Sequence, residues 1–132
     1  QGFGVFIDYG HSRSGVGDTL QALSKHKYAD VLHQPGLCDI TSHVDFEALG
    51  TAFTAAGCAT HGPVPQGPFL EAMGLHTRAE RLCVSANRRQ VRAIEAAVKR
   101  LASREEMGEL FKVLAVAHQG AAVPAPFEGL DA

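Results

Sequence analysis

The pattern of apolar residues along the chain predicts three strands. The run 5–7 is unbroken and apolar and ends at Asp8, as expected of a strand that helices cover on both faces. A second strand is predicted at 58–64, where Pro63 places it at the edge of a sheet or ends it. A third is predicted at 109–118 from its β-branched and aromatic residues.

Helical periodicity fills the intervals between these strands. Ser42 is the predicted cap of a helix that has one apolar face and ends at Gly57. A helical insertion follows the second strand, with short helices at 68–73 and 75–83 and a longer one capped by Asn87. Strands that alternate with helices predict an α/β fold.

Two segments lack a regular pattern. Residues 11–42 contain several Gly and Pro residues and predict a long ordered loop, in which 18–23 can start a short helix. Residues 121–132 predict a flexible tail behind a domain portion that spans 1–120.

Composition narrows the class of protein. The 132 residues are 45% hydrophobic, enough for one compact domain, and no apolar run is as long as a membrane span. With 12 Lys and Arg against 14 acids the net charge is -2, so nucleic acid is not an expected partner. The basic side chains of 88–104 are offset by Glu95, Glu105 and Glu106, as on a solvated helix face. Three separated Cys residues indicate reduced thiols in a cytosolic-type compartment.

The position of the first strand predicts that the chain continues upstream. A strand with this apolar run needs neighbours on both sides, yet it follows almost directly after Gln1, and no initiator Met precedes it. We therefore expect the chain to be the later part of a longer protein.

Candidate functional residues follow the first strand. In open α/β sheets, ligands bind beyond the carboxyl ends of the strands, so Asp8, Tyr9 and His11 are the first candidates. The alternative is that Asp8 only caps a turn.

A second cluster lies at the start of the first helix. Asp39, His43 and Asp45, together with two hydroxyl groups, can orient a polar substrate or bind a cation. Helix capping explains much of this cluster without a ligand. His43 remains open as a base, as a hydrogen-bond partner of Asp8 or Asp45, or as a solvated side chain.

Several common site types are not predicted. The seven His residues have no metal-site spacing, and the hydrolase motif GxSxG is absent, so neither metal binding nor hydrolase chemistry is expected. Gly15 and Gly17 lack the third glycine and the helix of a nucleotide-binding turn.

A series of short motifs carries a family resemblance over almost the whole chain. In order they are Asp8-Tyr9-Gly10-His11, Gly17-Asp18-Thr19-Leu20, Pro35-Gly36, Asp39-Ile40-Thr41, His43-Val44-Asp45-Phe46, Gln66, Phe69-Leu70, Met73-Gly74 and Met107-Gly108-Glu109-Leu110-Phe111. This series resembles the MidA-like family of class I S-adenosylmethionine-dependent methyltransferases. The family includes a mitochondrial assembly factor of respiratory complex I that methylates protein arginine, together with bacterial relatives.

The resemblance implies a fold, an activity and a set of site residues. It implies the carboxyl-terminal half of a Rossmann-like seven-stranded sheet with a helical insertion, in which 5–8, 58–64 and 111–118 are the fifth, sixth and antiparallel seventh strands. It implies S-adenosylmethionine as cofactor, although the family's glycine-rich cofactor turn is not in this chain. The implied substrate-binding residues are Asp8, Tyr9, His11, Asp39, His43, Asp45 and Gln66, with no catalytic base assigned.

The resemblance also implies partners and a compartment. The partner would be a protein substrate, such as a subunit of respiratory complex I, in the mitochondrial matrix of a eukaryote or the cytoplasm of a bacterium. Without its upstream half, the chain alone is expected to be inactive. The alternative is a protein-binding module for complex I assembly that does not catalyse a reaction.

Overall fold

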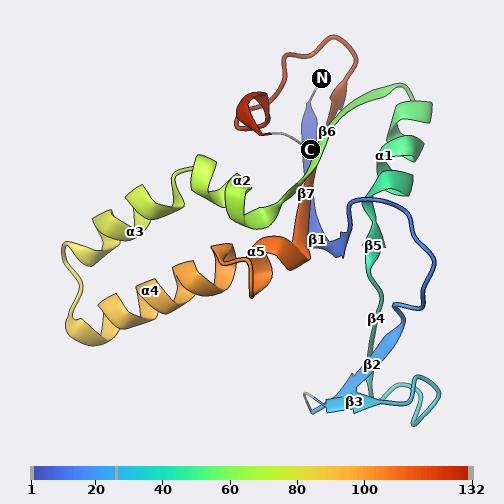
Figure 1. Cartoon of the computed structure of the whole chain (residues 1–132), viewed down its shortest axis with the longest axis horizontal. Helices are drawn as coiled ribbons and strands as arrows, with labels where there is room; N and C mark the ends of the chain where they lie inside the picture. The colour runs from blue at the N-terminus through green and yellow to red at the C-terminus, as the bar shows by residue number, and fades with distance from the viewer. Residues whose placement is uncertain (1, 26, 131–132) are drawn as a thin grey trace.

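The chain folds around a four-stranded sheet, beside which lie a smaller sheet and a projecting pair of helices (Figure 1). The computed structural model describes residues 2–25 and 27–130. The larger sheet has the order β5-β1-β7-β6. Its strands are β1 (Phe3–His11), β5 (Val44–Asp45), β6 (Cys58–Pro65) and β7 (Phe111–His118). The prediction of an α/β fold is confirmed.

The last strand of the chain lies in the middle of this sheet. β7 runs antiparallel to β1, from Phe3 opposite Ala117 to Tyr9 opposite Phe111, and antiparallel to β6 on its other side. β6 is an edge strand, as Pro63 predicted. β7 begins two residues later than the strand predicted at 109–118, because 109–110 belong to the short helix α5 (Met107–Leu110).

The core is built on both faces of β7. Its residues alternate between two buried clusters, as the period of two in a strand requires. One cluster contains Val64, Phe69, Val113, Ala115 and Phe127. The other contains Phe46, Leu114 and Val116 and lies under α1 (Phe46–Ala55).

The prediction that β1 is buried on both faces is wrong for the described residues. Phe53 of α1 contacts Phe6 on one face, with the ring centroids 5.0 Å apart. On the opposite face the side chains of Phe3, Val5 and Ile7 are 66%, 42% and 47% exposed. The apolar run is present, but within the part of the chain that the structure describes no helix covers this face.

The segment 11–42 forms a small sheet instead of a loop. Its strands are β2 (Gln21–Ser24), β3 (Lys27–Ala29) and β4 (Asp39–Thr41), antiparallel in the order β3-β2-β4. The helix predicted over 18–23 is wrong, because pairing with β3 and β4 overrides the weak local helical pattern.

The first helix begins three residues later than predicted. Asp45, not Ser42, is the N-cap of α1, and its Oδ1 accepts a hydrogen bond of 2.9 Å from the Ala48 backbone N–H. Pairing of Val44 and Asp45 with the end of β1 keeps 44–45 extended.

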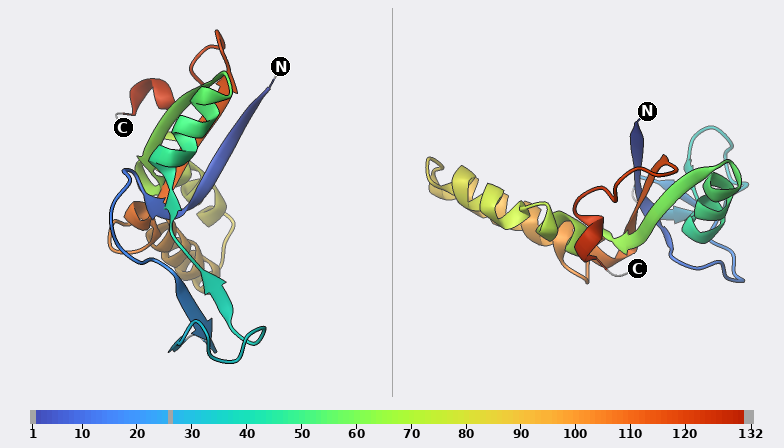
Figure 2. Two further views of the ribbon diagram at one scale, coloured as in Figure 1. Left: turned by 90° about the vertical axis from the view of Figure 1, so that its right-hand side faces the viewer. Right: turned by 90° about the horizontal axis from the view of Figure 1, so that it is seen from above.

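The helical insertion projects from the sheet (Figure 2). It contains α2 (Gln66–Ala72), α3 (Leu75–Cys83) and α4 (Arg88–Ala102), and the predicted capping box of Asn87 and Gln90 is present. Among the described residues, no helix has the length and apolar character needed to cross a membrane.

Part of the predicted flexible tail is anchored in the core. Phe127 begins a short 3-10 helix, Phe127–Gly129, and is buried against Phe69, with ring centroids 5.6 Å apart. Burial of the Phe127 side chain stabilises this part of the segment against the sheet. The Pro and Gly content of the segment had predicted a flexible tail.

Candidate functional site

The carboxyl end of β1 meets β5, and this meeting assembles the candidate site. The two strands are parallel, with Gly10 opposite Val44 and His11 opposite Asp45. A side chain at position 10 would collide with the Val44 backbone, so Gly10 allows this close approach. Parallel pairing brings together residues that stand more than thirty positions apart in the sequence.

Two imidazoles and a phenol form the centre of the site. His43 Nδ1 lies 3.2 Å from His11 Nε2, so one ring nitrogen donates an N–H to the other. Tyr9 contacts the edge of His43 at a centroid distance of 5.4 Å and also contacts Phe111 at 5.7 Å. Among the alternatives left open for His43, the structure shows neither Asp8 nor Asp45 as its hydrogen-bond partner, because its ring pairs with His11.

The Asp45 carboxylate lies beside this pair and is held by hydrogen bonds. Its Oδ1 accepts from the Ala48 backbone N–H at 2.9 Å, and its Oδ2 accepts from Ser14 Oγ at 2.7 Å. These bonds, with a smaller contribution from nearby His11, lower the pKa of Asp45 below 3.8. The carboxylate is therefore negatively charged at neutral pH.

A cavity of about 350 Å³ opens beside the His11–His43 pair. It is lined by His11, His43, Asp45 and the segment that follows β1, including Arg13 and Thr19. A larger cavity of about 660 Å³ extends along α1 and the middle of β6 and shares Arg13. We refer to the smaller cavity as the crevice, because it contains the candidate polar groups.

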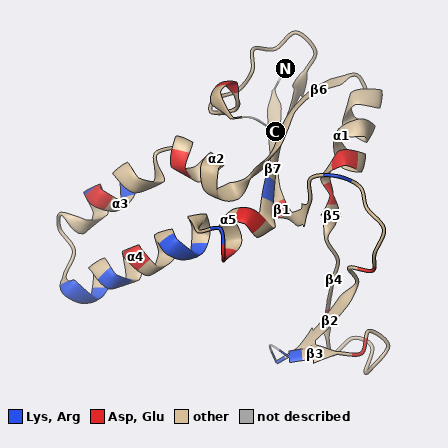
Figure 3. Cartoon of the chain, viewed as in Figure 1, with Lys and Arg blue, Asp and Glu red and all other residues tan. Residues whose placement is uncertain are grey.

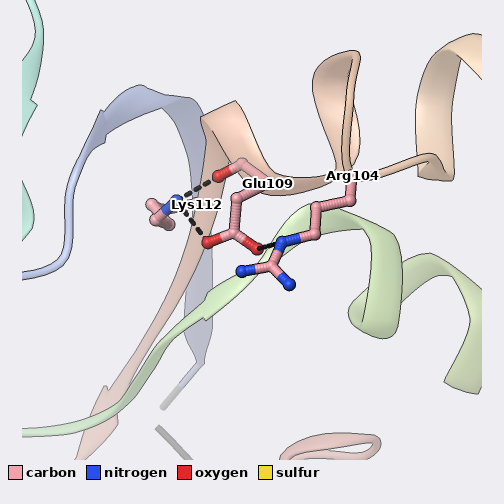
Figure 4. A network of polar contacts seen from close by, with 3 residues as sticks. All are labelled: Arg104, Glu109 and Lys112. Carbon is pink, nitrogen blue, oxygen red and sulfur yellow. Dashed lines mark hydrogen bonds and ion pairs between the residues drawn. The ribbon is translucent and has the colours of Figure 1, made fainter.

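A network of three charged residues lies where β7 begins, at the edge of the sheet where β1 ends (Figure 4). Lys112 is buried, and its Nζ donates to the Glu109 carbonyl and lies 3.6 Å from Glu109 Oε1. Glu109 Oε2 in turn lies 3.8 Å from Arg104 Nε. The network connects the end of the helical insertion to the sheet.

Four of the predicted site residues do not line the crevice. Tyr9 contacts the His43 ring but is not part of the lining. Asp8 is exposed and accepts a hydrogen bond of 2.8 Å from the Tyr9 backbone N–H. Asp39 belongs to β4 of the smaller sheet. Gln66 is buried at the start of α2, where its Nε2 donates to the Leu101 carbonyl at 2.9 Å.

Sequence reasoning missed Arg13, Glu47 and Lys112. Glu47 Oε2 accepts a 2.7 Å hydrogen bond from the Ser14 backbone N–H and so fixes the segment after β1. Lys112 had a visible signal, since a cation inside a buried apolar strand needs a partner and Glu109 stands three residues earlier. Arg13 had none, because its place depends on the path of an irregular segment.

Comparison with known proteins assigns this fold and site to a class. A family model described as "Putative S-adenosyl-L-methionine-dependent methyltransferase" matches residues 1–64. Relatives named protein arginine methyltransferase NDUFAF7, mitochondrial, include those of Homo sapiens and Danio rerio, each 34% identical over 87% of this chain. The Drosophila melanogaster homologue is 35% identical over the same share. The chain spans about a quarter of these relatives, 26–27% of their length.

Two crystal structures of Burkholderia thailandensis proteins are similar. An uncharacterized protein matches with a TM-score of 0.82 and 33% identity, over 92% of this chain and 34% of its own. A second, described as a "likely methyl transferase" and bound to S-adenosyl-homocysteine, matches with a TM-score of 0.78 and 31% identity, over 92% of this chain and 33% of its own. The family model and the similar structures thus identify the chain as part of the class of S-adenosylmethionine-dependent methyltransferases. Within that class it belongs to the MidA-like family, as the motif series predicted.

The family's cofactor is S-adenosylmethionine. Gly15 and Gly17 border open space, since an added Cβ on either residue would meet no atom within 4 Å. The strand β2, not a helix, follows Gly17. Among the described residues, no group of three His, Cys, Asp or Glu side chains could hold a metal ion.

Proposed function

We propose that the protein containing this chain methylates an arginine of a protein substrate, and that the crevice forms the acceptor side of its active site. The observation that carries the proposal is the grouping of Asp45 with the His11–His43 pair at the carboxyl ends of two parallel strands. The names of the relatives, which are protein arginine methyltransferases, support arginine as the acceptor.

The crevice has the groups that a guanidinium needs. The anionic Asp45 carboxylate can accept hydrogen bonds from the planar cation and orient the nitrogen that receives the methyl group. Transfer of a methyl group to this nitrogen releases one N–H proton. The second ring nitrogen of the imidazole that donates its N–H within the His11–His43 pair carries a free lone pair and can take that proton.

We place this chain in a longer protein, with the domain portion at 1–120. S-adenosylmethionine would supply the methyl group while bound mainly by residues upstream, since the family's glycine-rich cofactor turn is not in this chain. The resemblance favours a subunit of respiratory complex I as the substrate. The compartment would be the mitochondrial matrix of a eukaryote, since the eukaryotic relatives are named mitochondrial, or the cytoplasm of a bacterium.

The test combines cofactor binding with methyl transfer. Calorimetric titration with S-adenosylmethionine should show stoichiometric binding to the full-length protein and weak or no binding to the 132-residue chain. In the full-length protein, Asp45→Asn should lower the methylation of arginine about tenfold to a hundredfold, because a hydrogen bond to a cation is lost. The matched control is Asp30→Asn, an exposed carboxylate outside the crevice, and it should keep full activity.

Two outcomes contradict the proposal. A full-length protein that binds no S-adenosylmethionine would favour the non-catalytic protein-binding module. A folded Asp45→Asn variant with full activity would remove Asp45 from the acceptor side.

A further inference from the structure

The helices α3 and α4 form an arm, residues 75–104, that leaves the sheet on the side of the crevice. α2 starts directly after β6, and α5 returns the chain to the first residue of β7. Because β7 is antiparallel to both β1 and β6, these connections lie at the edge where β1 ends. Figures 1 and 2 show the arm projecting away from that edge. A protein that reaches the crevice can therefore also contact the arm.

The root of the arm is held in one orientation. Gln66 donates to the Leu101 carbonyl at 2.9 Å, and Arg104 pairs with Glu109 at 3.8 Å. Side chains at positions 67 and 108 would collide with the Ala102 carbonyl, so both positions are glycine. These contacts fix the arm relative to the sheet, which suits a surface that positions a partner.

The arm concentrates the positive charge of the chain (Figure 3). Residues 75–104 contain eight of the twelve Lys and Arg residues and two of the fourteen acids, although the whole chain has a net charge of -2. Glu105 and Glu106, which offset these charges in the sequence, follow α4 in the turn before α5. The arm is therefore more basic than the sequence pattern indicated.

The cations of the arm are largely available to a partner. Of the eight, Arg104 is the one with a carboxylate within 4.0 Å among the described residues, namely that of Glu109. The other seven are exposed and belong to α3 and α4. Exposed cations that do not serve the fold favour an electrostatic role in binding.

One groove of the arm combines these charges with apolar surface. A groove of about 450 Å³ along α3 and the turn before it is lined by Met73, Gly74, Thr77, Arg78, Arg81 and Leu82. Met73 is 59% exposed and Leu82 is 47% exposed. Since Arg78 and Arg81 stand three residues apart on a helix, both lie along the same groove.

The groove fits a polypeptide better than a nucleic acid. Proteins that bind single strands stack bases on aromatic side chains, and residues 75–104 contain no Phe, Tyr or Trp. An adaptable Met and a Leu next to two Arg match the mixed apolar and charged composition of protein interfaces.

We propose that the groove along α3 docks an acidic segment of the protein substrate, whose carboxylates pair with Arg78 and Arg81 while an apolar side chain contacts Met73 and Leu82. This proposal rests on the proposed function, since the docked protein is the one that is methylated. It adds a recognition surface outside the crevice.

The test measures peptide binding to the full-length protein by fluorescence anisotropy. The probe is a labelled peptide in which Glu alternates with Leu, and the reference peptide has Gln in place of Glu. Arg78→Glu with Arg81→Glu should weaken binding of the Glu–Leu peptide about tenfold or more. The matched control, Lys25→Glu with Lys27→Glu, makes the same charge change in the smaller sheet and should leave the affinity within about twofold.

The outcomes separate this proposal from the proposed function. Equal affinity of the arm and control variants, equal binding of the Glu and Gln peptides, or preferential binding of single-stranded RNA would overturn it. If the Glu variant unfolds, Arg78→Gln with Arg81→Gln supplies the same comparison. Calorimetry with S-adenosylmethionine is performed on each variant, because its binding tests the proposed function and should not change when the groove is altered.

Discussion

At the scale of single residues, Asp45 has two roles that the structure brings together. Its carboxylate caps α1 and also lines the crevice beside His11 and His43. The hydrogen bonds that cap the helix also keep the carboxylate charged, since they lower its pKa. The start of a helix thus supplies a fixed negative charge to the site.

The lowered pKa of Asp45 predicts a pH dependence of stability. Because the folded-state pKa lies below 3.8, ionised Asp45 stabilises the protein above that pH, and the stabilisation is lost as the pH falls through the lowered value. Melting curves of the parent and Asp45→Asn proteins should therefore differ at neutral pH and converge in acid. A difference that persists unchanged below the lowered pKa would contradict this assignment.

The candidate site could be predicted where its residues are neighbours in the sequence. His43 and Asp45 stand at the start of a helix, and His11 directly follows a strand, so local pattern identified all three. The pairing of His11 with His43 could not be predicted, because it depends on the register of β1 and β5. Gln66 was predicted as a substrate-binding residue, yet its amide is used to hold α4.

At the scale of elements, local signals and distant pairing gave different results. The capping box at Asn87 and the apolar periodicity of α4 predicted that helix, because both signals lie within one segment. The strands β2 and β4 are short and pair across residues 25–38, so no local period indicated them. A local sequence pattern does not show which distant strands pair, so the small sheet could not be predicted from it.

The glycines at the root of the arm predict a contrast between two substitutions. Gly108→Ala places a Cβ against the Ala102 and Ser103 carbonyls and should destabilise the full-length protein by about 1–3 kcal/mol. The control is Gly50→Ala in α1, where no atom lies within 4 Å and helix propensity should stabilise by roughly 0.5–1 kcal/mol. Urea unfolding of both variants measures the difference, and the same sign for both would exclude a tightly packed root.

At the scale of the whole molecule, the exposed face of β1 is the main departure from a closed α/β fold. Its apolar side chains match those of a strand covered on both faces, and the relatives are about four times longer than this chain. We expect residues of the longer protein to cover Phe3, Val5 and Ile7.

Burial of this face can be measured in the full-length protein. Ile7→Ala should lower the free energy of unfolding by about 2–5 kcal/mol if the side chain is covered. The matched control is Leu32→Ala, at an 84% exposed position of the smaller sheet's connection, and its effect should stay within about 0.5 kcal/mol. Equal small effects in denaturant titrations would show that Ile7 stays exposed in the full-length protein.

The central place of β7 has a consequence for how the protein is made. β1 and β6 do not pair with each other, and each forms its ladder with β7, which leaves the ribosome last of the three. Until residues 111–118 emerge, β1 and β6 lack the strand that joins them, and the apolar side chains beneath them stay open to chaperones and proteases. If translation stalls within the arm, the nascent chain would therefore contain β1 and β6 without the strand β7 that joins them.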